Sequence, residues 1–282
     1  MESAQTQKAL ASAGLSRVAS ALAALAQPSI RLTTTPTDEA KLTIGASKFG
    51  GLPDMPIGTA WPILNGVAMS FVGQIRLEDV QPYDEHHQLP SVGLLAFFYD
   101  AQQQTYGDDA NDRGGWQVYY FAGTAQLQRT SAPVNLPDNA RFKPCALAFS
   151  SEPTMPLEPH LERADLTLSA GEQQQYETFL SSFPTAQGSR GIRNRMLGYA
   201  DTIQDDMRLQ AQLLSHGLTD GGDPRAKTLL PGAMDWTLLL QVDSDPNAGM
   251  RWASEGRLYF WIERAALAAA KFDHVWMVLQ SD

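Results

Sequence analysis

The chain has 282 residues, of which 43% are apolar and 18% are charged, a composition that argues against intrinsic disorder. Its formal net charge is −10, and no basic run interrupts this acidic balance. Because phosphate contacts supply most of the affinity of nucleic-acid-binding proteins, direct binding to DNA, RNA or an anionic membrane is not expected.

Apolar side chains recur at helical spacing near the N-terminus, at Leu10, Leu15, Val18, Leu22 and Leu25. A secretion signal is the alternative, but Arg17 and several serines interrupt the apolar stretch. We therefore predict that residues 1–27 form an amphipathic helix packed on the rest of the chain. The sequence has no stretch of about 20 apolar residues, the length that a membrane span needs, and we expect a cytoplasmic protein.

The first half then reads as strands joined by loops. β-branched and aromatic residues predict strands at 30–35, 69–77, 94–99, 116–121 and 146–149. Glycine and proline are dense between residues 48 and 62, which indicates a structured loop.

The second half begins with helices and returns to strands. Ser169 and Glu172 form a capping-box pattern, which predicts a helix over 169–183, and a second helix is expected within 204–218. Strands are predicted at 236–243, 257–262 and 275–280, with a short helix at 265–270 before the last strand.

Four segments of the first half recur in the same order in the second half. These pairs are 50–54 with 197–201, 71–75 with 238–242, 93–98 with 256–261, and 116–120 with 275–279. Convergent strand composition is the alternative explanation. The order predicts an α+β fold of two similar sheet-rich halves, about 28–150 and 190–282, related by a pseudo-twofold axis and joined by a helical segment within a single domain, 28–282.

Several of these motifs together resemble the YwqG family, a bacterial family of unknown function. The resemblance runs from Lys48 to Gln280 and is carried by Lys48-x-Gly-Gly-x-Pro-Asp54, Trp61-Pro62, Arg113-Gly-Gly-Trp116, Leu197-Gly-Tyr199, Gln241-x-Asp243 and Trp276. It implies a duplicated, sheet-rich fold and supplies no catalytic residues. It also implies that the chain is encoded beside bacterial antagonistic toxins, as members of this family often are. Some related proteins look like immunity proteins, which bind and neutralise such a toxin.

The sequence has no motif of a known catalytic or metal site. It lacks a nucleophile elbow, a phosphate-binding glycine loop and a zinc-type histidine or cysteine pattern, so we expect no metal and no cofactor. The single cysteine, Cys145, lies among apolar residues and is expected to be a core residue rather than a nucleophile. Residues 243–249 resemble the start of a calcium loop, but Ala248 replaces the required glycine and a hairpin turn is the simpler reading.

Three functions are compatible with this pattern. The first is a non-enzymatic immunity protein that binds a cognate toxin, such as a basic nuclease, through loop acids; the candidates are Asp108, Asp109, Asp112, Asp205, Asp206, Asp243 and Asp245. The second is a small-molecule binding protein that uses a cleft between the halves; the candidates are Asp54, Trp61, Gln74, Trp116, Asp201, Gln241 and Trp252. The third is an enzyme with an unfamiliar active site. Against these functions, tryptophan is more often a core residue than a pocket residue, and loop acids are commonly just solvated.

Overall fold

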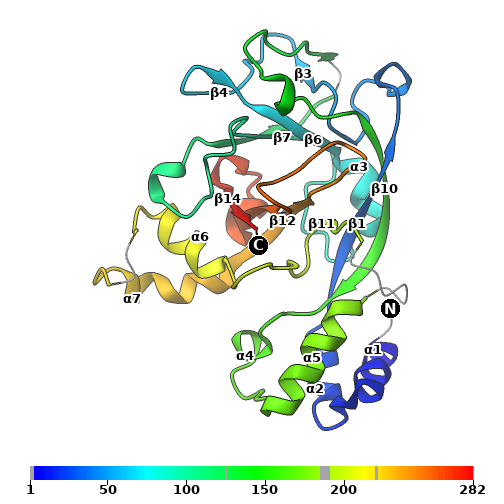
Figure 1. Cartoon of the computed structure of the whole chain (residues 1–282), viewed down its shortest axis with the longest axis vertical. Coiled ribbons are helices and arrows are strands. Elements are labelled where there is room, and N and C mark those ends of the chain that lie inside the picture. The colour runs from blue at the N-terminus through cyan, green and yellow to red at the C-terminus, as the bar shows by residue number, and fades with distance from the viewer. Residues whose placement is uncertain (1–2, 125, 185–190, 220–221, 282) are drawn as a thin grey trace.

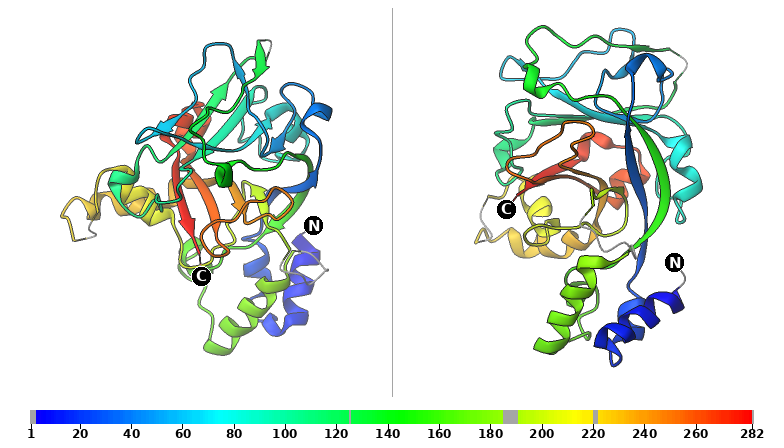
Figure 2. Two further views of the ribbon diagram at one scale, coloured as in Figure 1. Left: turned by 45° about the horizontal axis from the view of Figure 1, so that its top comes forward. Right: turned by 45° about the vertical axis from the view of Figure 1, so that its right-hand side comes forward.

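The computed structural model describes residues 3–124, 126–184, 191–219 and 222–281. The predicted segments 1–27 and 190–282 therefore begin or end at residues that lie outside the described part of the chain. The chain combines helices with one large, near-barrel antiparallel sheet (Figures 1 and 2). In spatial order its ten strands are β14 (Trp276–Gln280), β13 (Arg257–Glu263), β12 (Trp236–Asp243), β11 (Asn194–Met196), β1 (Gln27–Pro36), β10 (Cys145–Thr154), β2 (Lys48–Phe49), β6 (Ser70–Arg76), β7 (Leu94–Tyr99) and β8 (Trp116–Phe121). Two small sheets pair β3 (Asp54–Pro56) with β9 (Leu127–Arg129), and β4 (Ile63–Leu64) with β5 (Val67–Ala68).

The predicted mixed fold is confirmed, and the strongest strand predictions coincide with observed strands. Every residue of β7 and of β12 is buried, as expected for continuous apolar runs. The curvature of the sheet brings its two ends together around one core. The rings of Phe97 and Phe260 lie 5.1 Å apart, and those of Trp116 and Trp276 lie 4.9 Å apart.

Strands β1 and β10 form the centre of the sheet and pair along their whole length. Their register runs from Gln27 opposite Thr154 to Pro36 opposite Cys145. The two strands extend beyond their neighbours and lead to a group of helices at one end of the molecule (Figures 1 and 2). On the two sides of this pair, the meanders β6–β7–β8 and β12–β13–β14 each contain a register shift within the first strand pair.

That group of helices, the helical lobe, contains α1 (Ser3–Leu10), the π-helical turn η1 (Ala11–Leu15), α2 (Ala19–Ala23), α4 (Pro159–Glu162) and α5 (Ala170–Ser182). It has its own apolar core, in which Leu15 and Leu22 pack with Tyr176 and Phe179. The single N-terminal helix predicted from the apolar spacing is broken at Gly14, whose φ of +90° is accessible mainly to glycine. The capping box of α5 is present as predicted.

The remaining helical segments are short and cover the ends of the sheet. They are α3 (Leu77–Val80), α6 (Arg208–Ser215), α7 (Ala226–Leu229), α8 (Arg264–Ala268), and the 3₁₀ turns η2 (Glu39–Lys41), η3 (Gln81–Tyr83), η4 (Ala110–Asp112), η5 (Asp138–Ala140), η6 (Leu230–Asp235) and η7 (Phe272–His274). Among the described residues, none of the helices has the length and apolar content needed to cross a membrane.

Candidate functional site

A pocket of about 1010 Å³ opens between the helical lobe and the C-terminal part of the sheet. Its walls come from the end of β10, the end of α5, β11, the segment 199–203 and the loop 243–257. All of its lining residues lie between positions 154 and 257, so the pocket separates the helical segment from the second predicted half. It is therefore not the cleft between the two halves that the sequence suggested.

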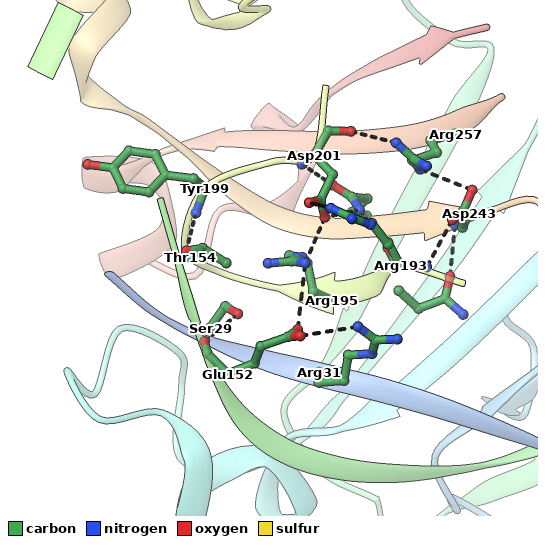
Figure 3. Close-up of polar contacts among 12 residues, drawn as sticks. Ser29, Arg31, Glu152, Thr154, Arg193, Arg195, Tyr199, Asp201, Asp243 and Arg257 are labelled. Atoms are coloured by element: carbon green, nitrogen blue, oxygen red, sulfur yellow. Dashed lines mark hydrogen bonds and ion pairs between the residues drawn. The ribbon is translucent and has the colours of Figure 1, made fainter. Parts of the chain in front are cut away.

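Arg195 of β11 forms the floor of the pocket and is only 1% exposed. One terminal nitrogen lies 2.7 Å from a carboxylate oxygen of Asp201 and 3.6 Å from one of Glu152 (Figure 3). Its Nε has no hydrogen-bond partner within the part of the chain that the structure describes. A buried guanidinium donor without an acceptor is uncommon, because leaving such a group unpaired costs free energy.

Asp201 is held beside this arginine by a clamp from the neighbouring strand. Its backbone N–H donates to Oε1 of Gln241 at 2.8 Å, and Nε2 of Gln241 donates to its carboxylate at 3.0 Å. Burial raises the pKa of Asp201, but the charges of Arg195 and Arg193 outweigh that effect and keep the pKa below its usual value. Asp201 is therefore an ionised carboxylate that already has strong partners.

A second ion pair lies at the outer side of the pocket. Arg257 donates to the backbone oxygen of Asp201 at 2.8 Å, and its Nε lies 3.0 Å from Asp243 without forming a hydrogen bond. The Asp243 carboxylate also accepts the backbone N–H of Arg193 at 2.9 Å. Behind the floor, Glu152 pairs with Arg31 at 3.2 Å.

These charged groups form what we call the pocket cluster: Arg31, Glu152, Arg193, Arg195, Asp201, Asp243 and Arg257 (Figure 3). The cluster contains four arginines and three carboxylates, a formal charge of +1. Arg251 and Glu255 also line the pocket and cancel each other. The rest of the wall is partly apolar, with Leu157, Leu180, Phe183, Ile192 and Met250.

A similar arrangement occurs in the N-terminal part of the sheet, where the central lysine and aspartate are closed to solvent. Lys48 and Asp54 are both fully buried, and Glu39 and Arg129 complete the group that we call the closed cluster. Glu39 lies 2.8 Å from the Lys48 ammonium and 2.9 Å from the Arg129 guanidinium. Strand β9 covers this group, because Arg129 stands opposite Asp54 in the β3–β9 pair.

The two clusters share their polar contacts residue by residue. Gln74 accepts from the N–H of Asp54 and donates to its carboxylate, as Gln241 does at Asp201. The second amide hydrogen of each glutamine goes to a backbone oxygen, that of Ala46 or that of Arg193. In the strand register, Lys48 lies opposite Gln74 and Arg195 lies opposite Gln241.

Comparison with known families places most of the chain in one of them. Residues 47–281 match a domain of unknown function, DUF1963. The chain belongs to the DUF1963 family. No curated protein matches it. The DUF1963 region contains every residue of the closed cluster except Glu39 and every residue of the pocket cluster except Arg31, whereas the N-terminal helices lie outside it.

The cleft candidates predicted from the sequence are distributed over both clusters and the core of the DUF1963 domain. Only Asp201 lines the pocket, while Gln241 positions it from behind. Asp54 and Gln74 belong to the closed arrangement. The three tryptophans are structural: their ring nitrogens donate to backbone oxygens in the cases of Trp61, Trp116 and Trp252.

The acidic candidates also divide into two groups. Asp108, Asp109 and Asp205 are exposed, and Asp112 and Asp206 are half-buried, with Asp112 accepting the N–H of Gly107 and Asp206 pairing with Arg208. Asp243 and Asp245 are buried. Asp245 accepts hydrogen bonds from Thr34 and Asn194, so the loop resembling a calcium site is occupied by protein donors.

The arginines that dominate the pocket were not predicted from the sequence. Arg193 and Arg195 precede Asp201 at the spacing that Ala46 and Lys48 keep before Asp54, a signal available once the segments 50–54 and 197–201 are aligned. Among the described residues, no three His, Cys, Asp or Glu side chains are arranged to hold a metal ion. Cys145 is buried, and burial raises the pKa of its thiol to about 11.

Proposed function

We propose that this DUF1963 protein is a binding protein that takes a small ligand, without turnover, in the pocket above Arg195. The observation that carries the proposal is the buried Arg195 guanidinium, which lines a large open pocket with its Nε unpartnered among the described residues. Ligand pockets combine apolar walls with a few oriented polar groups, and this pocket has both.

Binding fits the chemistry of the pocket better than catalysis. A general base needs a pKa near the working pH, whereas the pKa of Asp201 is held below its usual value. The phenol of Tyr199, at the pocket wall, has a pKa raised mainly by burial, which makes its proton harder to remove. Among the described residues, those that line the pocket include neither histidine nor cysteine.

The test uses four probes that share a phenyl ring and differ in their polar group: benzoate, phenyl phosphate, benzamide and benzylammonium. We expect at least one of them to shift the backbone NMR signals of pocket residues. The variant Ile192→Trp, which places an indole at the pocket wall, should abolish that shift. Ile57→Trp is the matched control, because Ile57 is 76% exposed and does not line the pocket. Absence of binding by all four probes up to about 10 mM, the range of weak fragments, would overturn the proposal.

A protein partner is the second candidate, in the form of an immunity protein that neutralises a basic toxin in the bacterial cytoplasm. It is supported by exposed acids on adjoining segments. The loop carrying Asp108 and Asp109 is joined to α6 by the hydrogen bond from Gln210 to Gly107, and Asp205 lies just before α6. An acidic surface accelerates encounter with a cationic partner. Association with the cognate toxin should then slow as salt rises, while an acidic partner, or failure to protect cells from the toxin, would contradict the idea.

We also propose that the two halves are related by a pseudo-twofold axis, as in the YwqG resemblance. Outward from the β1–β10 pair, the strands follow as β11, β12, β13, β14 on one side and β2, β6, β7, β8 on the other. The matched contacts of Gln74 and Gln241 support the same relation. An experimental structure in which the two strand sets do not superpose would contradict it.

A further inference from the structure

We infer that the ligand carries an oxyanion group, a carboxylate or a phosphate, which binds Arg195 and supplies the negative charge that Glu39 supplies in the closed cluster. This inference rests on the proposed function and adds the chemical class of the ligand. It follows from a comparison of the two clusters, which share the same glutamine–aspartate contacts but differ in net charge.

The closed cluster is balanced, and the pocket cluster is not. In the first, Lys48 and Arg129 face Glu39 and Asp54, which is two positive against two negative charges. In the second, four arginines face three carboxylates among the described residues. Unbalanced charge in a partly desolvated site is costly, so the pocket cluster is one carboxylate short of the arrangement seen in its counterpart.

The structure also indicates where the missing carboxylate would lie. Glu39 accepts the backbone N–H of Leu52, two residues before Asp54, at 3.0 Å. Thr154 accepts the N–H of Tyr199, two residues before Asp201, at 2.9 Å. Thr154 therefore makes the backbone contact that Glu39 makes in the other cluster.

The two side chains differ in what else they can do. The second oxygen of Glu39 reaches both cations of the closed cluster. The hydroxyl of Thr154 is short and neutral, and it donates to the backbone oxygen of Gln27. Nothing at position 154 thus extends a negative charge toward Arg195, and the space beyond it is the pocket itself.

The chemistry of the guanidinium selects the ligand group. Arg195 lines the pocket, and its buried Nε–H has no partner among the described residues. A guanidinium edge matches a carboxylate or phosphate through two parallel hydrogen bonds. Apolar residues such as Leu157 and Ile192 line the same pocket and can cover the carbon body of such a ligand. An amine would meet net positive charge instead.

The first experiment uses the wild-type protein and the four probes defined above. Benzoate, phenyl phosphate or both should bind at least tenfold more tightly than benzamide and benzylammonium, as measured by NMR titration. Whichever of the two anions binds more tightly identifies the charged group of the ligand as a carboxylate or a phosphate. If benzamide or benzylammonium binds as well as the anions, the inference is overturned while the proposed function stands. If none of the probes binds, the proposed function itself is overturned.

The second experiment adds the missing charge to the chain. Thr154→Glu places a carboxylate where Glu39 has one, and Thr154→Gln is the neutral control of the same size. We expect T154E to unfold at a higher temperature than T154Q and to bind benzoate at least tenfold more weakly than T154Q does. A T154E protein that is less stable than T154Q, or that binds benzoate equally well, contradicts the inference. If neither variant folds, the wild-type probe comparison still decides.

Discussion

The closed cluster and the pocket cluster are built on the same clamp of a glutamine and an aspartate, yet the aspartate is sealed in the first and faces a pocket in the second. At Asp54 the side chain is fully buried, because Arg129 and the β3–β9 pair cover it. At Asp201 the side chain is 17% exposed and faces the pocket. The difference teaches that a buried structural ion cluster becomes a candidate binding site when its cover is absent and one of its charges is missing.

Burial has a measurable electrostatic consequence in the sealed cluster. Desolvation lowers the pKa of Lys48, and the hydrogen bond from its ammonium to Glu39 offsets only part of this effect. The pKa of Asp54 is raised by burial, but the hydrogen bond from Arg129 and the charge of Lys48 bring it below its usual value. Each charge in this cluster therefore depends on the others, which makes it the more sensitive of the two to substitution.

The largest expected difference concerns the two aspartates. Asp54→Asn leaves Lys48 and Arg129 with one carboxylate fewer inside the protein, and should cost about 3–5 kcal/mol of unfolding free energy. Asp201→Asn should cost about 1–3 kcal/mol, because solvent in the pocket can hydrate the arginines that it leaves. Urea denaturation of both variants measures the two values, and equal losses would remove the distinction between sealed and open clusters.

The next difference concerns rescue by an external anion. Glu39→Gln and Glu152→Gln each remove one carboxylate and should each cost about 1–3 kcal/mol. Added benzoate should restore part of the thermal stability of E152Q, because Arg195 lines the pocket. It should leave E39Q unchanged, since Lys48 and Asp54 are fully buried and neither lines the pocket. Rescue of both variants would show that the anion acts elsewhere.

A smaller effect is expected from pH. The pKa values of Asp54 and Asp201 lie below the ordinary value of 3.8, so their pairing stabilises the folded state at pH values above about 4. This stability is lost as the pH falls through the folded-state pKa values, where the folded state must also take up protons. Urea midpoints between pH 2.5 and pH 6, chosen as a range around 4, should therefore fall less steeply for the double variant D54N/D201N than for the wild type. Parallel profiles would contradict the assignment.

The smallest effect concerns Cys145, which pairs with Phe49 on the sealed side of the sheet. Burial raises the pKa of its thiol to about 11, so a thiol reagent at pH 8 should react only after unfolding. Cys145→Ala should cost only about 1–2 kcal/mol, the lower end for a small buried side chain. Benzoate should not change the rate at which the thiol reagent modifies Cys145 under conditions where the protein is folded. Fast reaction of the native protein would show that the sealed side opens.

Much of the sheet could be predicted from local patterns. Apolar runs such as 94–99 and 236–243 predict buried strands because burial on both faces requires them. The capping pair Ser169 and Glu172 predicted α5 for a similarly local reason. The break at Gly14 was missed because apolar spacing continues on both sides of a residue whose positive φ leaves no mark on periodicity.

The pocket could not be predicted in the same way. Arg31, Glu152 and Arg195 are brought together by strand pairings between distant segments, which no short motif records. Asp243 ends a strand and Asp245 follows it, a pattern typical of exposed loops. However, Asn194 accepts the backbone N–H of Asp243, and Asn194 and Thr34 donate to Asp245, so this turn is held inside. Only the alignment of the segments 50–54 and 197–201 brings Arg195 to attention, because Arg195 then stands at the position of Lys48.

The long β1–β10 pairing also sets an order of assembly during synthesis. The contact between Gln27 and Thr154 spans 127 residues, whereas β6, β7 and β8 are joined by connections that let them pair as soon as they are made. On a ribosome that releases the N-terminus first, β1 must therefore wait, unpaired, until β10 emerges, and β11 can join β1 only later still. The N-terminal helices face the same delay, since their apolar partners in α5 follow β10 in the chain. The centre of the sheet is thus the last part of the first half to form, and the nascent chain carries an exposed strand and an apolar helix surface that a chaperone would recognise.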